Sequence, residues 1–407
     1  MEQAPPLPTA VIDTPLGVLA VLVVVLAVLF TFHRTRAGAR LFSVVPLLVF
    51  CYFVPALLSN LGIIPLESDV YTFIRRVLLP ASLLLLVLAT DIPAVIRLGR
   101  DAVTLFLAGT ASILLGGPLA FLALGWMFPD SALDQAWRGL AALCGSWIGG
   151  GANFIAVGDS VQASPATMSL MVVVDVGIAN VWMAILLAFA GREAAMDTKM
   201  GARRERIDEV REKIAAYQAE VSRPLNLPDL LAILGLAIGA TALVTWIAGF
   251  LPDVGTIING FTWVVCLITA VGVALSFTRL RRLEGAGAST VGSLFLYLLV
   301  ATIGASAQFH RVLENLPLLA VGALWMAIHA ATMLLVRRLL RAPVFFLAVG
   351  SQANVGGAAS APVVAAAFHP ALAPVGVLLA VLGYVLGTYG GLVAAFLLQQ
   401  VARYHGA

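Results

Sequence analysis

Residues 145–153 read GSWIGGGAN, and this stretch decides how the chain around it can fold. It lies inside an apolar run, where each glycine costs about 1 kcal/mol of helix propensity relative to alanine. A second stretch of the same kind, GSQANVGG, occupies residues 350–357 of another apolar run. A helix is therefore predicted to break at both places. Within hydrocarbon, a break is tolerated only where the freed backbone groups face protein, water or a bound solute.

The composition around these stretches is that of an integral membrane protein. The 407 residues are 61% apolar and only 11% charged, with a mean hydropathy of +1.01. A soluble protein carries about a quarter charged residues. The apolar blocks are roughly 17 to 25 residues long, which is the length one helix needs to cross a bilayer. We therefore expect an all-α polytopic protein in a bacterial-type cytoplasmic (inner) membrane, and the small net charge of +3 gives no reason to expect a nucleic-acid partner.

Twelve apolar runs, with a range of 11 to 13, are predicted to be transmembrane helices. They begin near Pro15, Phe42, Ile74, Ala102, Gly139, Met168, Leu230, Ile258, Ser289, Pro317, Val344 and Leu372. The polar segment 191–226 carries many charges of both signs and is predicted to be a cytoplasmic linker. It separates a first transmembrane repeat, 1–190, from a second, 227–407.

The two halves share an order of motifs that predicts an internal repeat. GGANFIAV at 150–157 parallels GGAASAPV at 356–363, and VLAT at 87–90 parallels LVAT at 299–302. Basic clusters follow the first, third, eighth and tenth runs. If all are cytoplasmic, equivalent helices point in opposite directions, as in an inverted repeat, and the linker and C-terminus share the cytoplasmic side. Six full crossings per half would instead leave the two halves parallel, which conflicts with the charge pattern. Three explanations remain open: one span is miscounted, one run is re-entrant, or one basic cluster is not cytoplasmic.

The broken runs are the predicted substrate site. Two half-helices that meet at mid-membrane aim N-terminal dipole ends and free carbonyl groups at one point, which suits an anionic group and a small cation. The predicted solute-binding residues are the polar and glycine residues of both stretches: Asn153, Gln352, Asn354, Ser146, Ser351, Gly150, Gly151, Gly356 and Gly357. The competing interpretation is that the small residues only allow close helix packing, as Gly145 with Gly149 or Gly387 with Gly391 could.

Asp175 is an acid deep inside the sixth apolar run. A carboxylate there costs several kcal/mol unless it is paired, protonated or cation-bound, so we predict that it couples Na⁺ or H⁺. Asn180 is predicted to assist Asp175 in binding the coupling ion. The two residues are five positions apart and point in different directions from an ideal helix, so both line one cavity only if the helix is distorted or the cavity is broad. The alternative is a hydrogen-bonded packing acid. For His329, in the tenth run, hydrogen-bonded packing is the favoured interpretation.

With GSWIGGGAN and GSQANVGG identified, the whole chain resembles the uncharacterised YjcL-like family of membrane proteins. That family is distantly similar to the superfamily of cation/proton antiporters, anion transporters and bile-acid/sodium symporters. The resemblance implies a panel domain and a core domain, with two discontinuous helices that cross at residues 149–153 and 352–357. It also implies that Asp175 corresponds to the ion-binding acid of sodium/proton antiporters, although a single acid stands here instead of an adjacent pair.

These observations predict a secondary active transporter, not an enzyme. It would move a small organic solute, expected to be anionic, coupled to Na⁺ or H⁺ by alternating access around the two broken helices. A monovalent cation/proton antiporter is the alternative in the same class, and a channel or non-transporting scaffold is the alternative of another class. The expected partners are a small solute or ion and the lipid bilayer, with a homodimer left open. No cofactor or metal is expected apart from Na⁺ at Asp175.

Overall fold

The computed structural model describes residues 10–44, 47–89, 98–202, 207, 224–254, 257–306, 316–369 and 372–406, and every named element in these ranges is a helix. Each of the twelve apolar runs is helical. The first half contains α1 (Pro15–His33), α2 (Arg36–Val44), α3 (Leu47–Asn60), α4 (Asp69–Phe73), η1 (Ile74–Leu78), α5 (Leu79–Leu88), α7 (Arg100–Leu124), η2 (Gly125–Met127), α8 (Asp130–Ser160) and α9 (Pro165–Ala190). After α10 (Glu193–Met200), the second half contains α12 (Leu227–Ala248), α13 (Gly260–Ser276), η3 (Arg279–Ala286), α14 (Ala288–Ala305), α15 (Leu316–Leu340), α16 (Val344–Val355), α17 (Gly357–Phe368) and α18 (Ala373–Tyr404).

The helices have the length and composition of a polytopic membrane protein. Nine helical segments among the described residues are long and apolar enough to cross a membrane. This is fewer than the twelve spans predicted. The difference comes from three runs that form shorter helices: α3 with 14 residues, α13 with 17, and the pair α16 and α17 with 12 each.

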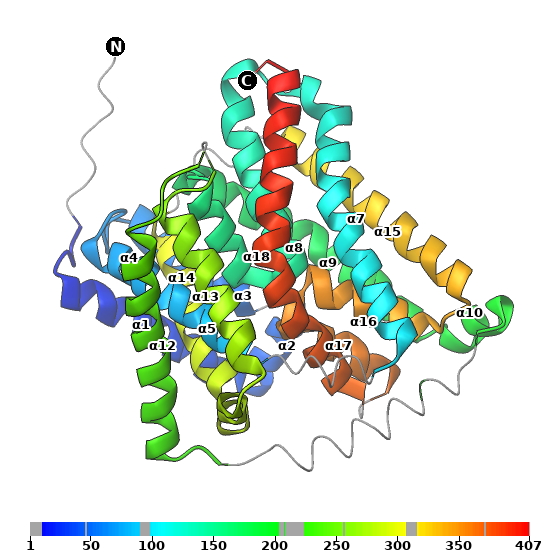
Figure 1. The fold of residues 1–407 in the computed structure, drawn as a ribbon, viewed down its shortest axis with the longest axis horizontal. Coiled ribbons are helices and arrows are strands. Elements are labelled where there is room, and N and C mark those ends of the chain that lie inside the picture. Colours follow the sequence, from blue (N-terminus) through cyan, green and yellow to red (C-terminus); the bar gives the residue numbers. More distant parts are fainter. Residues whose placement is uncertain are drawn as a thin grey trace.

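The helices form two groups that lie side by side (Figure 1). The first group contains α1, α3, α5, α12, α13 and α14, and the second contains α7, α8, α9 and α15 to α18. In the second group, glycines let α8 and α18 pack closely. A Cβ added to Gly387 would lie 2.6 Å from the Cα of Gly149, and one added to Gly391 would lie 3.2 Å from the Cα of Gly145. These four glycines therefore allow close packing of the two helices.

Helix α8 folds back on itself. Gly150 has φ 74° and ψ −171°, which interrupts the helical backbone. A Cβ added to Gly158 would lie 3.4 Å from the Cβ of Ala142, whereas 16 residues of continuous helix span about 24 Å. The guanidinium group of Arg138 also donates a hydrogen bond to the carbonyl group of Val161. We call α8 the first hairpin; its arms are residues 130–149 and 151–160.

Helices α16 and α17 form a second hairpin. Helix α16 ends at Val355, and α17 begins at Gly357, whose φ is +58°. The rings of Phe345 and Phe368 have centroids 5.6 Å apart. A straight helix would place residues 23 positions apart at a distance of about 35 Å. The chain therefore reverses direction near Gly356 as it does at Gly150.

The two hairpins enter the molecule from opposite ends. The first begins beside the C-terminus, where a Cβ on Gly406 would lie 3.9 Å from a carboxylate oxygen of Asp130. The second begins beside α10, because the backbone N–H of Val344 donates to Asp197 Oδ1 at 2.8 Å and Arg337 pairs with the same oxygen at 2.9 Å. Figure 1 places α10 and the C-terminus at opposite ends of α7. The described start of the linker and the C-terminus therefore lie at opposite ends of α7, whereas the charge pattern predicts one shared side.

Candidate functional site

The tips of the two hairpins meet inside the bundle. A Cβ added to Gly357 would lie 3.7 Å from the Cα of Gly150. Both glycines have a positive φ, a conformation that costs other residues about 1–2 kcal/mol. Glycine at these two positions therefore lets each chain reverse and approach the other.

A cavity of about 160 Å³ lies against the tips, between the two groups of helices. The first group contributes Tyr52 of α3 with Val300 and Ile303 of α14. The second group contributes seven of the predicted site residues: Ser146, Gly150, Gly151, Asp175, Asn180, Gln352 and Gly356. One water needs about 10–15 Å³ of such space, so the cavity has room for a solute of about ten non-hydrogen atoms.

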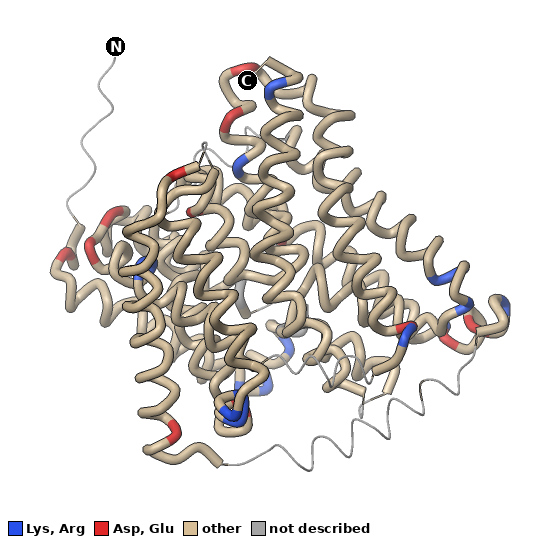
Figure 2. Tube along the Cα trace, in the orientation of Figure 1, with Lys and Arg blue, Asp and Glu red and all other residues tan. Residues whose placement is uncertain are grey.

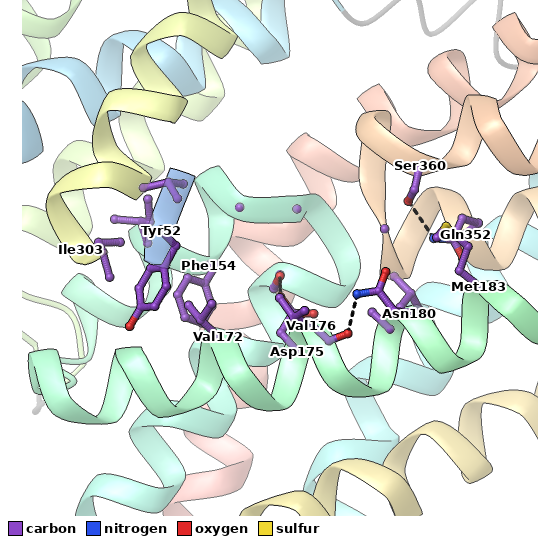
Figure 3. A pocket seen from close by; sticks show the side chains of 18 residues that line it. Tyr52, Phe154, Val172, Asp175, Val176, Asn180, Met183, Ile303, Gln352 and Ser360 are labelled. Carbon is purple, nitrogen blue, oxygen red and sulfur yellow. Dashed lines mark hydrogen bonds between the residues drawn. The ribbon is translucent and has the colours of Figure 1, made fainter. Parts of the chain in front are cut away.

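Asp175 lies on α9 and is half-buried at the cavity wall (Figure 3). The Ser146 hydroxyl donates to Oδ2 at 2.6 Å, and the Trp147 indole N–H donates to Oδ1 at 2.8 Å. A carboxylate can accept about four hydrogen bonds, so Asp175 keeps capacity for a cation or a donor on the cavity side. Among the described lining residues it is the single charged side chain.

Asn180 lines the same cavity one turn and a half further along α9. Its side-chain amide donates to the carbonyl oxygen of Val176 at 2.7 Å, the contact drawn in Figure 3. Helix α9 continues through both residues, so it is the breadth of the cavity that brings Asp175 and Asn180 to one wall.

Gln352 offers the cavity an acceptor that the protein itself does not use. The residue is 1% exposed, and its Nε2 donates to the hydroxyl of Ser360 at 2.7 Å, which ties the two arms of the second hairpin together. Its Oε1 has no hydrogen-bond partner among the described residues. Leaving a buried acceptor unpaired costs about 1–3 kcal/mol. A solute or cation that reaches this oxygen would remove that cost.

Asn153 is used by the protein as a clamp between α8 and α18. Its amide nitrogen donates to the carbonyl oxygens of Gly149 at 2.9 Å and Tyr384 at 3.1 Å. Its Oδ1 accepts from the hydroxyl of Thr388 at 2.5 Å. Asn153 is fully buried and is not among the described residues that line the cavity.

Asn354 makes the corresponding set of bonds between α16 and α7. Its amide nitrogen donates to Gly350 O at 2.9 Å and Phe106 O at 3.0 Å, and its Oδ1 accepts from Thr110 at 2.8 Å. It too lies outside the described cavity lining. In this conformation both asparagines hold the hairpins in place through bonds to neighbouring helices.

Ser351 and Gly357 also lie outside the described lining. The Ser351 hydroxyl accepts from the Trp182 indole at 2.7 Å and lies 2.7 Å from His329 Nε2. On the other side of the ring, Nδ1 lies 2.7 Å from the hydroxyl of Ser112, which itself donates to Gly109 O. His329 therefore donates through Nδ1 and accepts through Nε2. This buried network matches the packing interpretation of His329.

Sequence reasoning missed the apolar wall and Ser360. Figure 3 shows Tyr52, Phe154 and Ile303 at one end of the cavity, and Asn180, Gln352 and Ser360 at the other. The chain is 61% apolar. Its sequence therefore does not distinguish an apolar residue that lines the cavity from one that faces lipid. Ser360 carried a weak signal, because a hydroxyl within an apolar run needs a partner.

Comparison with known proteins agrees with the predicted resemblance. The family described as "Protein of unknown function (DUF819)" matches residues 20–401. The chain is also 26% identical over 352 residues to the uncharacterized membrane protein YjcL of Bacillus subtilis (strain 168), covering 82% of this chain and 85% of the relative. The resemblance to a YjcL-like family is confirmed, and with the long apolar helices it establishes an integral, multi-pass membrane protein.

Proposed function

The chain belongs to the DUF819 family, and we propose that it is a secondary active transporter of a small organic solute coupled to Na⁺ or H⁺. One observation carries the proposal: two hairpin tips, entering from opposite ends, meet at a cavity that holds an acid. Irregular backbone at membrane depth is tolerated where it lines a cavity or contacts a solute, and it is a common feature of transporter sites.

The hairpins also remove the conflict in the number of crossings. If both are re-entrant, five apolar runs cross fully in each half, which makes ten crossings in the chain. Five is odd, so equivalent helices point in opposite directions, as an inverted repeat requires. Lys and Arg gather toward the end that carries α10 (Figure 2), which the positive-inside rule assigns to the cytoplasm. The linker is then cytoplasmic and the C-terminus external.

The position of the cavity supports alternating access. Its walls come from both groups of helices, with Tyr52 and Ile303 on one side and Asp175 and Gln352 on the other. A shift of one group against the other would therefore change the end from which the cavity is reached. Both hairpin tips belong to the same group, so they would carry the polar half of the site with them.

The size of the cavity favours an organic solute over exchange of cations alone. A lone cation needs far less space than the volume of about ten non-hydrogen atoms that this cavity provides. Asp175 would bind the coupling ion, because neutralising an intramembrane carboxylate removes most of its desolvation cost. Proton binding and Na⁺ binding both achieve this.

Flux in proteoliposomes tests the proposal. Solutes are first selected by their ability to raise the unfolding temperature of the purified protein, because ligands that bind the native state stabilise it. Their uptake is then measured with a Na⁺ gradient and with a proton gradient. One of the gradients is expected to drive concentrative uptake, and Asp175→Asn is expected to abolish it.

The control is Asp253→Asn, an exposed aspartate in the loop before α13, which should keep the wild-type rate. Asp175→Glu should recover part of the coupled uptake because it restores the charge. A folded Asp175→Asn protein that still concentrates solute at the wild-type rate would refute the role of Asp175. If neither gradient drives uptake of any solute that binds, the chain is not a secondary transporter.

A further inference from the structure

The cavity is polar at one end and apolar at the other. Gln352, Ser360 and Asn180 lie at one end, and Asp175 lies between them and the apolar wall (Figure 3). Tyr52, Phe154, Val172 and Ile303 lie at the opposite end. Two more apolar residues, Ile155 and Val300, also line the cavity. A solute that fills this space needs a polar head and an apolar body.

The polar end accepts hydrogen bonds and carries negative charge. Its unpartnered group is the Oε1 of Gln352, an acceptor, and its charged group is the carboxylate of Asp175. Lys, Arg and His are absent from the described lining residues. A carboxylate solute would meet Asp175 at like charge where little water screens it, and would offer Gln352 Oε1 no donor.

The helix ends at the tips do not reverse this preference. At Gly150 the carbonyl end of one arm adjoins the amide end of the other, and the same holds at Gly356 between α16 and α17. The partial charges of these ends are opposite in sign and close together, so they largely offset one another. The field at the polar end is then set by the side chains.

Building on the proposed function, we infer that the solute is a small amphipathic amine. Its protonated nitrogen donates toward Asp175 and Gln352 Oε1, and its apolar body lies against Tyr52 and Phe154. About ten non-hydrogen atoms fill the available space. An ammonium head supplies the donors that both acceptors need, and its charge balances the acid, so the amine and the coupling cation bind Asp175 in alternation.

This inference is tested by the binding of three probes that share an apolar phenylalkyl group and differ in their polar group. The probes are 3-phenylpropylamine, 3-phenylpropan-1-ol and 3-phenylpropionate, measured by titration calorimetry on the full chain in lipid nanodiscs. The amine is expected to bind about tenfold or more tighter than the other two, because hydrogen bonds to charged groups are the strong ones. Gln352→Met keeps the length of the side chain and removes the acceptor, and it should weaken amine binding about fivefold to tenfold.

Two further variants separate the head from the body. Gln400→Met, at an exposed glutamine of α18, should leave all three affinities unchanged. Phe154→Ala should weaken all probes that bind by a similar factor, because it removes only apolar wall. Equal affinity for the three heads, preference for the carboxylate, or no binding of the amine would each overturn the inference. Amine binding without gradient-driven uptake would instead leave the inference standing and refute the transporter.

Discussion

Each of the two hairpins contains a buried asparagine, Asn153 in the first and Asn354 in the second, and the two make matching sets of three hydrogen bonds. In each, the amide donates to the carbonyl group four residues earlier and to a neighbouring helix, and it accepts from a threonine of that helix. Their serines differ. Ser146 donates to Asp175 at the cavity, whereas Ser351 bonds to Trp182 and His329 away from it. The support is thus present twice, but of the two serines it is Ser146 that contacts the acid at the cavity.

Among the residues near the hairpin tips, the largest effect is expected at the two asparagines. Asn153→Ala and Asn354→Ala should each lower the free energy of unfolding by about 3 kcal/mol, because each removes three buried hydrogen bonds. Denaturant titration in detergent measures this. Asn180→Ala, which loses one bond to Val176, should cost less than about 1 kcal/mol. If only one of the two substitutions, Asn153→Ala or Asn354→Ala, destabilises the protein, the two asparagines do not play equivalent structural roles.

The equivalent serines should separate stability from coupling. Ser351→Ala leaves the Trp182 indole N–H and the Nε2 of His329 without a partner in a buried network and should destabilise the fold by about 2 kcal/mol. Ser146→Ala should cost less than about 1 kcal/mol, since Asp175 keeps its bond from Trp147. It frees Oδ2 for the coupling cation, so apparent cation affinity in the uptake assay should rise, by about tenfold if one charge-assisted bond is released. If Ser146→Ala destabilised the fold and Ser351→Ala changed the cation affinity, the proposed difference between the two hairpins would be contradicted.

The tip glycines should respond alike in the two hairpins. Gly150→Ala and Gly357→Ala should each cost about 1–2 kcal/mol, because alanine is strained at positive φ although the nearest atoms, at 3.7 Å, leave room for a methyl group. Gly151→Ala is the matched control. Its added Cβ would also lie 3.7 Å from its nearest neighbour, but its φ is not positive, so it should change stability by less than about 0.5 kcal/mol. Equal costs at positions 150 and 151 would show that backbone strain is not the cause.

The sequence predicted the positions of the breaks better than the directions of the chain on either side. Glycine-rich stretches within apolar runs marked Gly150 and Gly356, and the buried acid marked Asp175. A break, however, carries no information on whether the next arm continues or returns, so crossing half-helices were expected where hairpins lie. The same ambiguity leaves the side of the C-terminus open in the sequence, because each re-entrant run changes the parity of the crossings.

The roles of the asparagines were beyond sequence reasoning for a different reason. Their partners Thr388 and Thr110 lie 235 and 244 residues away, so only the folded packing of α18 on α8 and of α7 on α16 shows that the amides are already occupied. An amide at a helix break looks the same in sequence whether it binds solute or a neighbouring helix. The apolar wall was hidden likewise, since Tyr52 and Ile303 sit among many similar residues.

The smallest effect is expected at an ion pair beside the first hairpin. Arg75 of η1 lies 3.6 Å from Asp159, near the end of α8, and so joins the two groups of helices. Its side chain is 33% exposed, and pairs of this kind contribute about 0–1 kcal/mol. Arg75→Gln should therefore change stability by less than about 1 kcal/mol, and Arg76→Gln, at an exposed neighbour, should change it less still.

The second hairpin is held differently at its base. Asp197 and Arg337 form a fully buried pair there, with 0% and 2% exposure, and Arg337→Gln should cost about 3–5 kcal/mol because it strands a buried charge. That pair joins α10 to elements of the same group, which do not separate if the groups move as bodies. The Arg75–Asp159 pair spans the boundary at which movement is proposed, and a contact that breaks in every cycle has to be weak. If Arg75→Gln costs as much as Arg337→Gln in the same denaturant titration, the boundary between the groups is fixed and the access change must occur elsewhere.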